Sequence, residues 1–139
     1  MQDIRYVINR PISSQEFKEV LQLSGLGERR PIDDDECLDG MLKNSNLLVT
    51  AWQKEKLVGV ARSITDFNYA CYLSDLAVDQ AYQKLGIGKM LVQQTQGELG
   101  KRCKILLFAA PNADAYYARI GFERNTNGWV LTKDKTVIR

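Results

Sequence analysis

The sequence predicts an α+β fold, with a mixed, mostly antiparallel central sheet flanked by helices, in one domain over residues 1–139. Two observations support this. Three consecutive segments with strand character occupy the middle of the chain, and helical patterns lie on both sides of them. The region 70–109 also has the pattern strand, helix, strand, which is typical of a crossover between parallel strands.

The first third of the chain predicts one strand and two helices. Residues Ile4–Ile8 alternate like a strand, and Ser13 and Glu16 form a capping box that opens a helix. The charged residues 28–31 follow as a loop. The acidic run Asp33–Glu36 then opens a second helix, where the helix dipole favours negative charge. A solvated helix start and the attraction of a cationic substrate both remain open for this run.

The remaining two thirds supply the sheet and its crossover. Polar turns separate the three middle strands, and an apolar stripe marks the helix that follows Gly88 and ends at Gly100. Strands are predicted at Leu47–Gln53, Leu57–Thr65, Ala70–Val78 and Ile105–Ala109, a short helix at Asn112–Ile120, and a last strand from Phe122 onward that includes Trp129–Leu131.

Composition excludes several classes of protein. A net charge of +2 is too small for a typical nucleic-acid-binding domain. Neither a secretory signal pattern nor an apolar run long enough to span a bilayer is present, so we expect a cytoplasmic protein that does not bind membranes. The chain has no histidine, which excludes Ser-His-Asp and Cys-His catalysis. Its three scattered cysteines favour neither disulfides nor a zinc site, and we expect no metal.

A glycine-containing turn, Gln83–Gly88, lies between a predicted strand and a predicted helix. The first N–H groups of a helix lack partners, and glycines let a ligand approach the backbone, so the turn predicts an anion site. Two nucleotide-binding motifs do not fit it. A Walker A loop needs Ser or Thr where Met90 stands, and a dinucleotide fingerprint needs a third glycine where Leu91 stands.

A third motif fits the turn. Gln83-x-x-Gly86-x-Gly88 resembles the acyl-CoA motif of the GNAT superfamily of N-acetyltransferases. Downstream, the segment from Asn112 to Phe122, with Tyr117-x-x-x-Gly121-Phe122 at its end, resembles the second signature of that superfamily. The resemblance implies acetyl-CoA as cosubstrate and a bulged, splayed strand before the turn, whose exposed backbone would pair with the pantetheine arm. The implied coenzyme-binding residues are Leu76, Ala77, Val78, Gln83, Lys84, Leu85, Gly86, Ile87, Gly88, Lys89 and Asn112.

The resemblance also implies roles in catalysis. Tyr117 would protonate the leaving thiolate or donate a hydrogen bond to it, and the N–H of Val78 would stabilise the oxyanion. Asp75 is the candidate general base, although a strand residue bonded to a neighbouring loop is the alternative interpretation.

The implied function is transfer of an acetyl group from acetyl-CoA to a primary amine, by direct attack in a ternary complex. Residues Ala61–Phe122, most clearly Ala61–Val92, are similar to bacterial and plant-type arylalkylamine acetyltransferases, which indicates a small amine, and a protein amino group is an equal candidate. A non-catalytic acyl-CoA-binding regulatory module is the alternative function. A homodimer is a candidate assembly.

Overall fold

A five-stranded sheet with the order β1-β2-β3-β4-β5 organises the first part of the chain. Neighbouring strands pair antiparallel from β1 to β4, whereas β4 and β5 are parallel. A helix connects the parallel pair, as a crossover requires, so the predicted mixed sheet is confirmed. The strands span Arg5–Ile8, Leu47–Gln53, Lys56–Thr65, Ala70–Val78 and Lys104–Leu106.

The computed structural model describes residues 3–138. The chain divides into two compact units, Met1–Phe108 and Ala109–Arg139, and the first holds the whole sheet. The predicted single domain stays a prediction.

Among residues 3–138, none of the helices combines the length and the apolar character that a membrane span requires. The helices are α1 (Ser14–Ser24), η1 (Leu26–Arg29), α2 (Asp35–Asn44), η2 (Gln80–Tyr82), α3 (Ile87–Gly97), η3 (Pro111–Ala113) and α4 (Asp114–Arg119), where η denotes 3₁₀.

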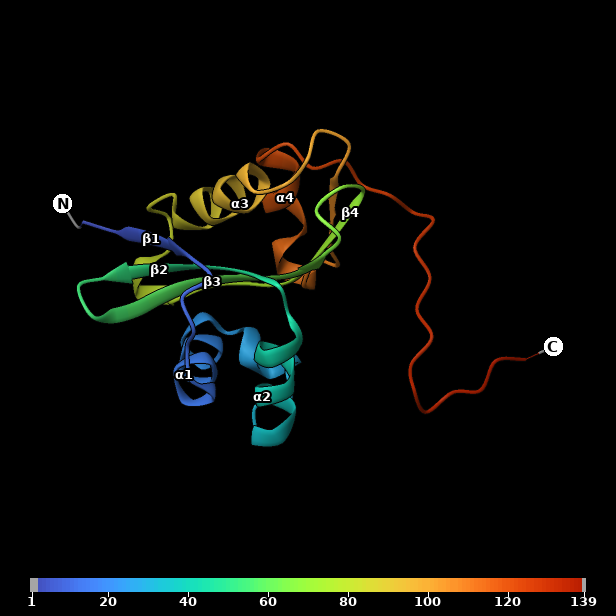
Figure 1. The fold of residues 1–139 in the computed structure, drawn as a ribbon, viewed down its shortest axis with the longest axis horizontal. Helices are drawn as coiled ribbons and strands as arrows, with labels where there is room; N and C mark the ends of the chain where they lie inside the picture. The colour runs from blue at the N-terminus through green and yellow to red at the C-terminus, as the bar shows by residue number, and fades with distance from the viewer. Residues whose placement is uncertain (1–2, 139) are drawn as a thin grey trace. The chain divides into compact units, whose positions relative to one another are not determined.

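Helices α1 and α2 cover one face of the sheet (Figure 1). The predicted capping box opens α1: Ser13 Oγ accepts from the N–H of Glu16, and Glu16 Oε1 accepts from the N–H of Ser13, each at 3.0 Å. Asp34 caps α2, since its Oδ1 accepts from the N–H of Cys37 at 3.0 Å. The acidic run therefore serves a helix start, and its attraction of a cationic substrate stays a prediction.

The two faces of the sheet bury different sets of side chains. Helix α3 covers the face opposite α1 and α2 (Figure 1). A Cβ at Gly59 of β3 would lie 3.1 Å from Leu91 and 3.3 Å from Ile87, so α3 packs directly on the strand backbone. The core cluster on the α1 and α2 face consists of Phe17, Val20, Leu21, Leu38, Trp52, Leu57, Val60 and Ala77.

Strand β4 contains a β-bulge. Its register with β3 pairs Leu73 with Ser63 but Asp75 with Arg62, so Ser74 opposes no residue. Side chains alternate along a strand, and one extra residue shifts that alternation. Asp75 therefore shares with Arg62 the face that α1 covers.

The predicted last strand is wrong. In the described part of the second unit, the residues after α4 form turns and irregular backbone. The side chains of Trp129, Val130 and Leu131 are exposed, Trp129 to 93%. Residues with strand propensity form a strand when a neighbouring strand is there to pair with them. In the described chain the sheet ends at β5, so these residues have no strand partner.

Three smaller differences concern boundaries. The expected loop at residues 28–31 begins with the last residues of η1, Glu28 and Arg29. Helix α3 ends at Gly97 rather than Gly100, and β5 ends at Leu106 rather than Ala109. The end of a helix or a short strand depends on packing, which the sequence pattern does not specify.

Candidate active site

The segment after β4 is fixed by its own side chains. Asp79 Oδ1 accepts from the N–H of Ala81 at 2.9 Å, which caps η2, and Asp79 Oδ2 lies 3.3 Å from Lys56 Nζ. Tyr82 is buried and donates its hydroxyl to Gln53 Oε1. These contacts hold the start of the glycine turn against the β2–β3 hairpin.

The glycine turn exposes a row of backbone N–H groups. Lys84 has φ 68° and Gly86 has φ 81°, both left-handed, and α3 begins at the next residue. Within residues 3–138, none of the N–H groups from Lys84 to Lys89 donates to another group of the protein. The N–H of Gln83 differs, since it lies 3.5 Å from the carbonyl of Gln80. With the helix dipole, this row forms an anion site.

Within residues 3–138, β4 pairs with β5 at Ala70–Tyr72, and beyond Tyr72 this edge of β4 pairs with no strand. The N–H of Asp79 donates to the carbonyl of Val58 at 2.8 Å. Hydrogen-bonded and non-hydrogen-bonded pairs alternate in an antiparallel ladder, so every second residue turns its backbone groups away from β3. Those residues are Leu76 and Val78.

The glycine turn contacts the open edge of β4, although η2 separates the two in the sequence. Gln83 Nε2 donates to the carbonyl of Val78 at 3.0 Å, so the turn folds back on the strand. Ala77, between the two edge residues, directs its backbone groups to β3 and its side chain into the core, where it is 2% exposed. Peptide-binding domains use such an edge to pair with extended ligands.

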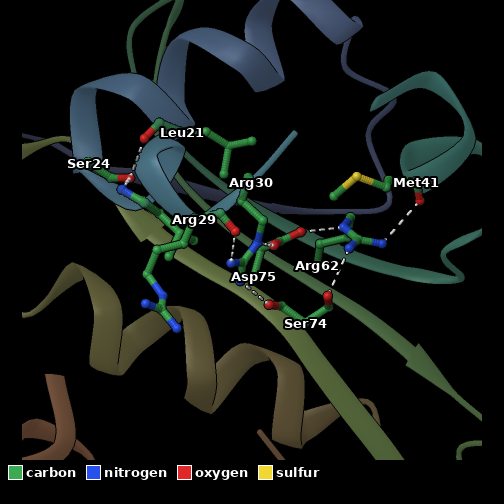
Figure 2. Close-up of polar contacts among 9 residues, drawn as sticks. Leu21, Ser24, Arg29, Arg30, Met41, Arg62, Ser74 and Asp75 are labelled. Atoms are coloured by element: carbon green, nitrogen blue, oxygen red, sulfur yellow. Dashed lines mark hydrogen bonds and ion pairs between the residues drawn. The ribbon is translucent and has the colours of Figure 1, made fainter. Parts of the chain in front are cut away.

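Asp75 lies fully buried between two arginines (Figure 2). Arg30 Nε donates to Asp75 Oδ1 and Arg62 Nε donates to Asp75 Oδ2, each at 2.5 Å. Both carboxylate oxygens are therefore engaged, which argues against the role of general base. Because Arg30 belongs to the α1–α2 connection, the geometry agrees with the alternative interpretation of a strand residue bonded to a neighbouring loop.

In the second unit, the second motif forms α4 and the turn that ends it. Phe122 N–H donates to the carbonyl of Tyr117 at 3.0 Å, and Gly121 N–H donates to the carbonyl of Ala118 at 3.2 Å. This is a Schellman motif, and Gly121, with φ 109°, is its left-handed residue. The turn brings Phe122 edge-on to the ring of Tyr117, with ring centroids 5.5 Å apart.

Two further residues of the second unit matter for the site. Tyr116 packs edge-on against Tyr117, with ring centroids 5.4 Å apart, and burial raises the pKa of its phenol. Asn112 lies in η3 and is exposed. The predicted site residues thus fall into two groups, one within Asp75–Lys89 in the first unit and one in the second.

Sequence reasoning missed Arg30 and Arg62. Arg62 is the single charged residue of Leu57–Thr65, and a charge in a buried strand needs a partner, so this position could have been found. Arg30 follows Arg29 in a charged loop, and nothing in the sequence distinguishes the two.

Comparison with known families agrees with the two motifs. Residues 22–130 match the acetyltransferase (GNAT) domain family. The chain belongs to the GNAT family. The family expected from the glycine turn and the tyrosine motif is therefore confirmed.

Among curated relatives, this GNAT chain is similar to an uncharacterized N-acetyltransferase, ycf52, of Pyropia yezoensis. The two are 32% identical over 93 residues, which cover 63% of this chain and 53% of the relative. The chain spans about half the length of the curated relative it matches.

Solved structures share the fold. A GNAT family acetyltransferase from Streptococcus pneumoniae superposes with a TM-score of 0.78 at 21% identity, covering 96% of this chain and all of the other. The aminoglycoside N-acetyltransferase AAC(6')-Iy in complex with CoA superposes with a TM-score of 0.71 at 14% identity, covering 97% of each chain.

Proposed function

We propose that this GNAT chain transfers an acetyl group from acetyl-CoA to a primary amine by direct attack in a ternary complex. One observation carries the proposal. The free N–H groups from Lys84 to Lys89 lie a few residues after the open edge of β4 at Leu76 and Val78, and the contact of Gln83 with the carbonyl of Val78 brings the two together. An anion site beside an unpaired strand edge fits a pyrophosphate joined to an extended arm that contains amides.

The residues fit coenzyme A part by part. The N–H row of the glycine turn would hold the pyrophosphate, and the glycines keep side chains away from it. Backbone groups of Leu76 would pair with the pantetheine arm, and the N–H of Val78 would donate to the thioester oxygen as negative charge develops there. Asn112 would add a side-chain contact to the arm. A protein with the same fold is known in complex with CoA, which agrees with coenzyme A as the proposed ligand.

The amine must lose a proton before it attacks. An alkylammonium has a pKa near ~10.4, so about one molecule in 2,500 is neutral at pH 7, a cost of about 4.6 kcal/mol. A base that receives the proton through water would lower this cost. Asp75 is the base that the sequence suggests, and the hydrogen bond that each of its carboxylate oxygens accepts from an arginine is an argument against that role.

Tyr117 would act on the leaving thiolate. Its reference pKa is ~10 against ~8.5 for a thiol, so full proton transfer is uphill by about 2 kcal/mol. A hydrogen bond to the developing thiolate supplies stabilisation without that transfer. The Schellman turn supports the role, because Phe122 packs on the Tyr117 ring and restricts its orientation.

For the acceptor we propose only a class of molecule. A small amine and a protein amino group are both acceptors of the expected chemistry, the cytoplasmic location stays a prediction, and so does the homodimer. An enzyme with few insertions around the sheet suits either acceptor class.

A panel of amines tests the proposal. Purified protein is incubated with acetyl-CoA and each amine, and release of free thiol is measured. Thiol release that depends on one amine, with an acetylated product of matching mass, supports the acetyltransferase. Binding of coenzyme A without turnover of any aliphatic, aromatic or peptide amine would favour the non-catalytic acyl-CoA-binding module instead.

A further inference from the structure

We propose that Arg30 and Arg62 are positioning residues that hold the β-bulge at Ser74, so that the open edge of β4 pairs with the pantetheine arm. The inference rests on the proposed function, because it assigns a purpose to a structure beside the coenzyme site. Its first observation is that Ser74 has no partner in β3. An unpaired bulge residue leaves backbone groups that need other contacts.

The two arginines supply those contacts (Figure 2). Arg30 Nη2 donates to the carbonyl of Ser74 at 2.7 Å, and Arg62 Nη2 donates to its hydroxyl at 2.9 Å. The same two guanidinium groups hold Asp75, the next residue, through their Nε atoms. Two consecutive residues of β4 are therefore held by both arginines at once.

Each arginine makes one more hydrogen bond, to α2 from Arg62 and to the preceding residue from Arg30. Arg62 is 4% exposed, and its Nη1 donates to the carbonyl of Met41 in α2 at 3.1 Å. Arg30 Nη1 donates to the carbonyl of Arg29 at 2.9 Å, within the α1–α2 connection. The bulge is thus connected to β3, to α2 and to the segment after η1.

Stability alone is a weak reason for this cluster. It buries the carboxylate of Asp75 and the guanidinium of Arg62, with the partly buried Arg30 beside them, and the desolvation of buried ion pairs often cancels their attraction. Apolar side chains of similar volume often give equal stability. Because the hydrogen bonds of this cluster form together only when β4 has its bulge at Ser74, the cluster can instead favour that strand register over others.

The selected geometry decides which backbone groups reach the open edge. A shift of one residue between β4 and β3 would turn the groups of Ala77 outward and those of Leu76 and Val78 inward. The pantetheine arm and the acetyl group would then lose their partners. The phosphate site would not, because Asp79 and Tyr82 fix the glycine turn independently of Ser74.

This separation defines the experiment. Arg30→Gln is compared with the unmodified chain by calorimetric binding of coenzyme A and of 3′-phospho-ADP, the nucleotide part of coenzyme A without the arm. We expect coenzyme A to bind about tenfold more weakly or worse, since a charged hydrogen bond is lost at the bulge, while 3′-phospho-ADP changes by less than about twofold. Arg29→Gln is the matched control and should change neither affinity, because Arg29 is exposed and its side chain points away from Asp75 (Figure 2).

A second variant tests the same proposal if Arg30→Gln does not fold, which circular dichroism would detect. Ser74→Ala removes only the hydroxyl that Arg62 holds, and it should weaken coenzyme A by about fivefold with the same selectivity. Equal weakening of both ligands, or unchanged affinity for coenzyme A in both variants, overturns the positioning role. If the unmodified chain binds neither ligand, the proposed function fails, and the positioning role fails with it.

Discussion

Each of the two motifs places a left-handed glycine next to a helix, Gly86 before the start of α3 and Gly121 after the end of α4. The two glycines have opposite effects on the backbone groups of their helices. Gly86 precedes α3, and the N–H groups around it have no acceptor within the described residues. Gly121 follows α4, and the turn there pairs the last carbonyls, Tyr117 and Ala118, with backbone donors. A helix start left open is suited to a ligand, whereas a helix end that is closed suits the packing of a side chain.

We therefore expect the first motif to bind the coenzyme and the second to orient the ring of Tyr117. The first glycine motif contributes backbone N–H donors, so the proposed anion site depends on its backbone conformation more than on its side chains. The second contributes a fixed ring, since the turn packs Phe122 against Tyr117. Substitutions in the two motifs should therefore alter different measurable quantities.

The largest effect is expected in the first motif. Gly88→Val places a branched side chain where phosphate oxygens would meet the N–H row, so calorimetry should detect no coenzyme A binding. Gly97→Val is the matched control, because Gly97 lies at the other end of α3 with nothing within 4 Å of its Cβ position. Binding by Gly88→Val at the affinity of the control would make the glycine a turn residue only.

In the second motif, Tyr117→Phe should lower kcat by ~10²–10⁴-fold, the range for loss of a positioned acid. The affinity for coenzyme A should barely change, because the ring and its packing remain. Steady-state kinetics with an accepted amine measures both, and kcat should fall more than KM rises.

Tyr116→Phe is the control for that experiment, since neighbouring residues of a helix point in different directions. It should leave kcat nearly unchanged. Full activity of Tyr117→Phe would remove the tyrosine from the mechanism and leave the ammonium of the intermediate as the proton source.

Ligand binding at the open helix start should stabilise the fold. At free acetyl-CoA of 100 times Kd, the free energy of unfolding should rise by ~2.7 kcal/mol through mass action, and ATP or NAD at equal concentration should add much less. Thermal denaturation measures the shift. Equal stabilisation by all three ligands would contradict a site selective for coenzyme A.

The smallest effect is expected at the closed helix end. Gly121→Ala forces a Cβ into left-handed backbone, which costs about 1–2 kcal/mol and should lower amide-exchange protection at residues 121 and 122 by about 5–30-fold. The affinity for coenzyme A should not change, since the proposed phosphate site lies elsewhere in the chain. A parallel loss of affinity would show that the two motifs do not act separately.

Local patterns made much of this predictable. The capping box at Ser13, the β2–β3 hairpin and the glycine turn before α3 depend on residues near each other in the sequence, and the sequence predicts each at its position. Local pattern failed at Trp129–Leu131, where strand character is strong but the described chain supplies no strand to pair with them.

The sequence by itself determined the family, the order of elements up to α4, and the segment whose N–H groups are open, because these depend on spacing and on glycine. Only the tertiary structure showed the contacts of Asp75. Its face depends on one extra residue in β4, and its partners, Arg30 and Arg62, stand 45 and 13 positions away in the chain. Periodicity describes a regular strand, so a bulge and the distant charges that hold it become visible only when the strands are paired.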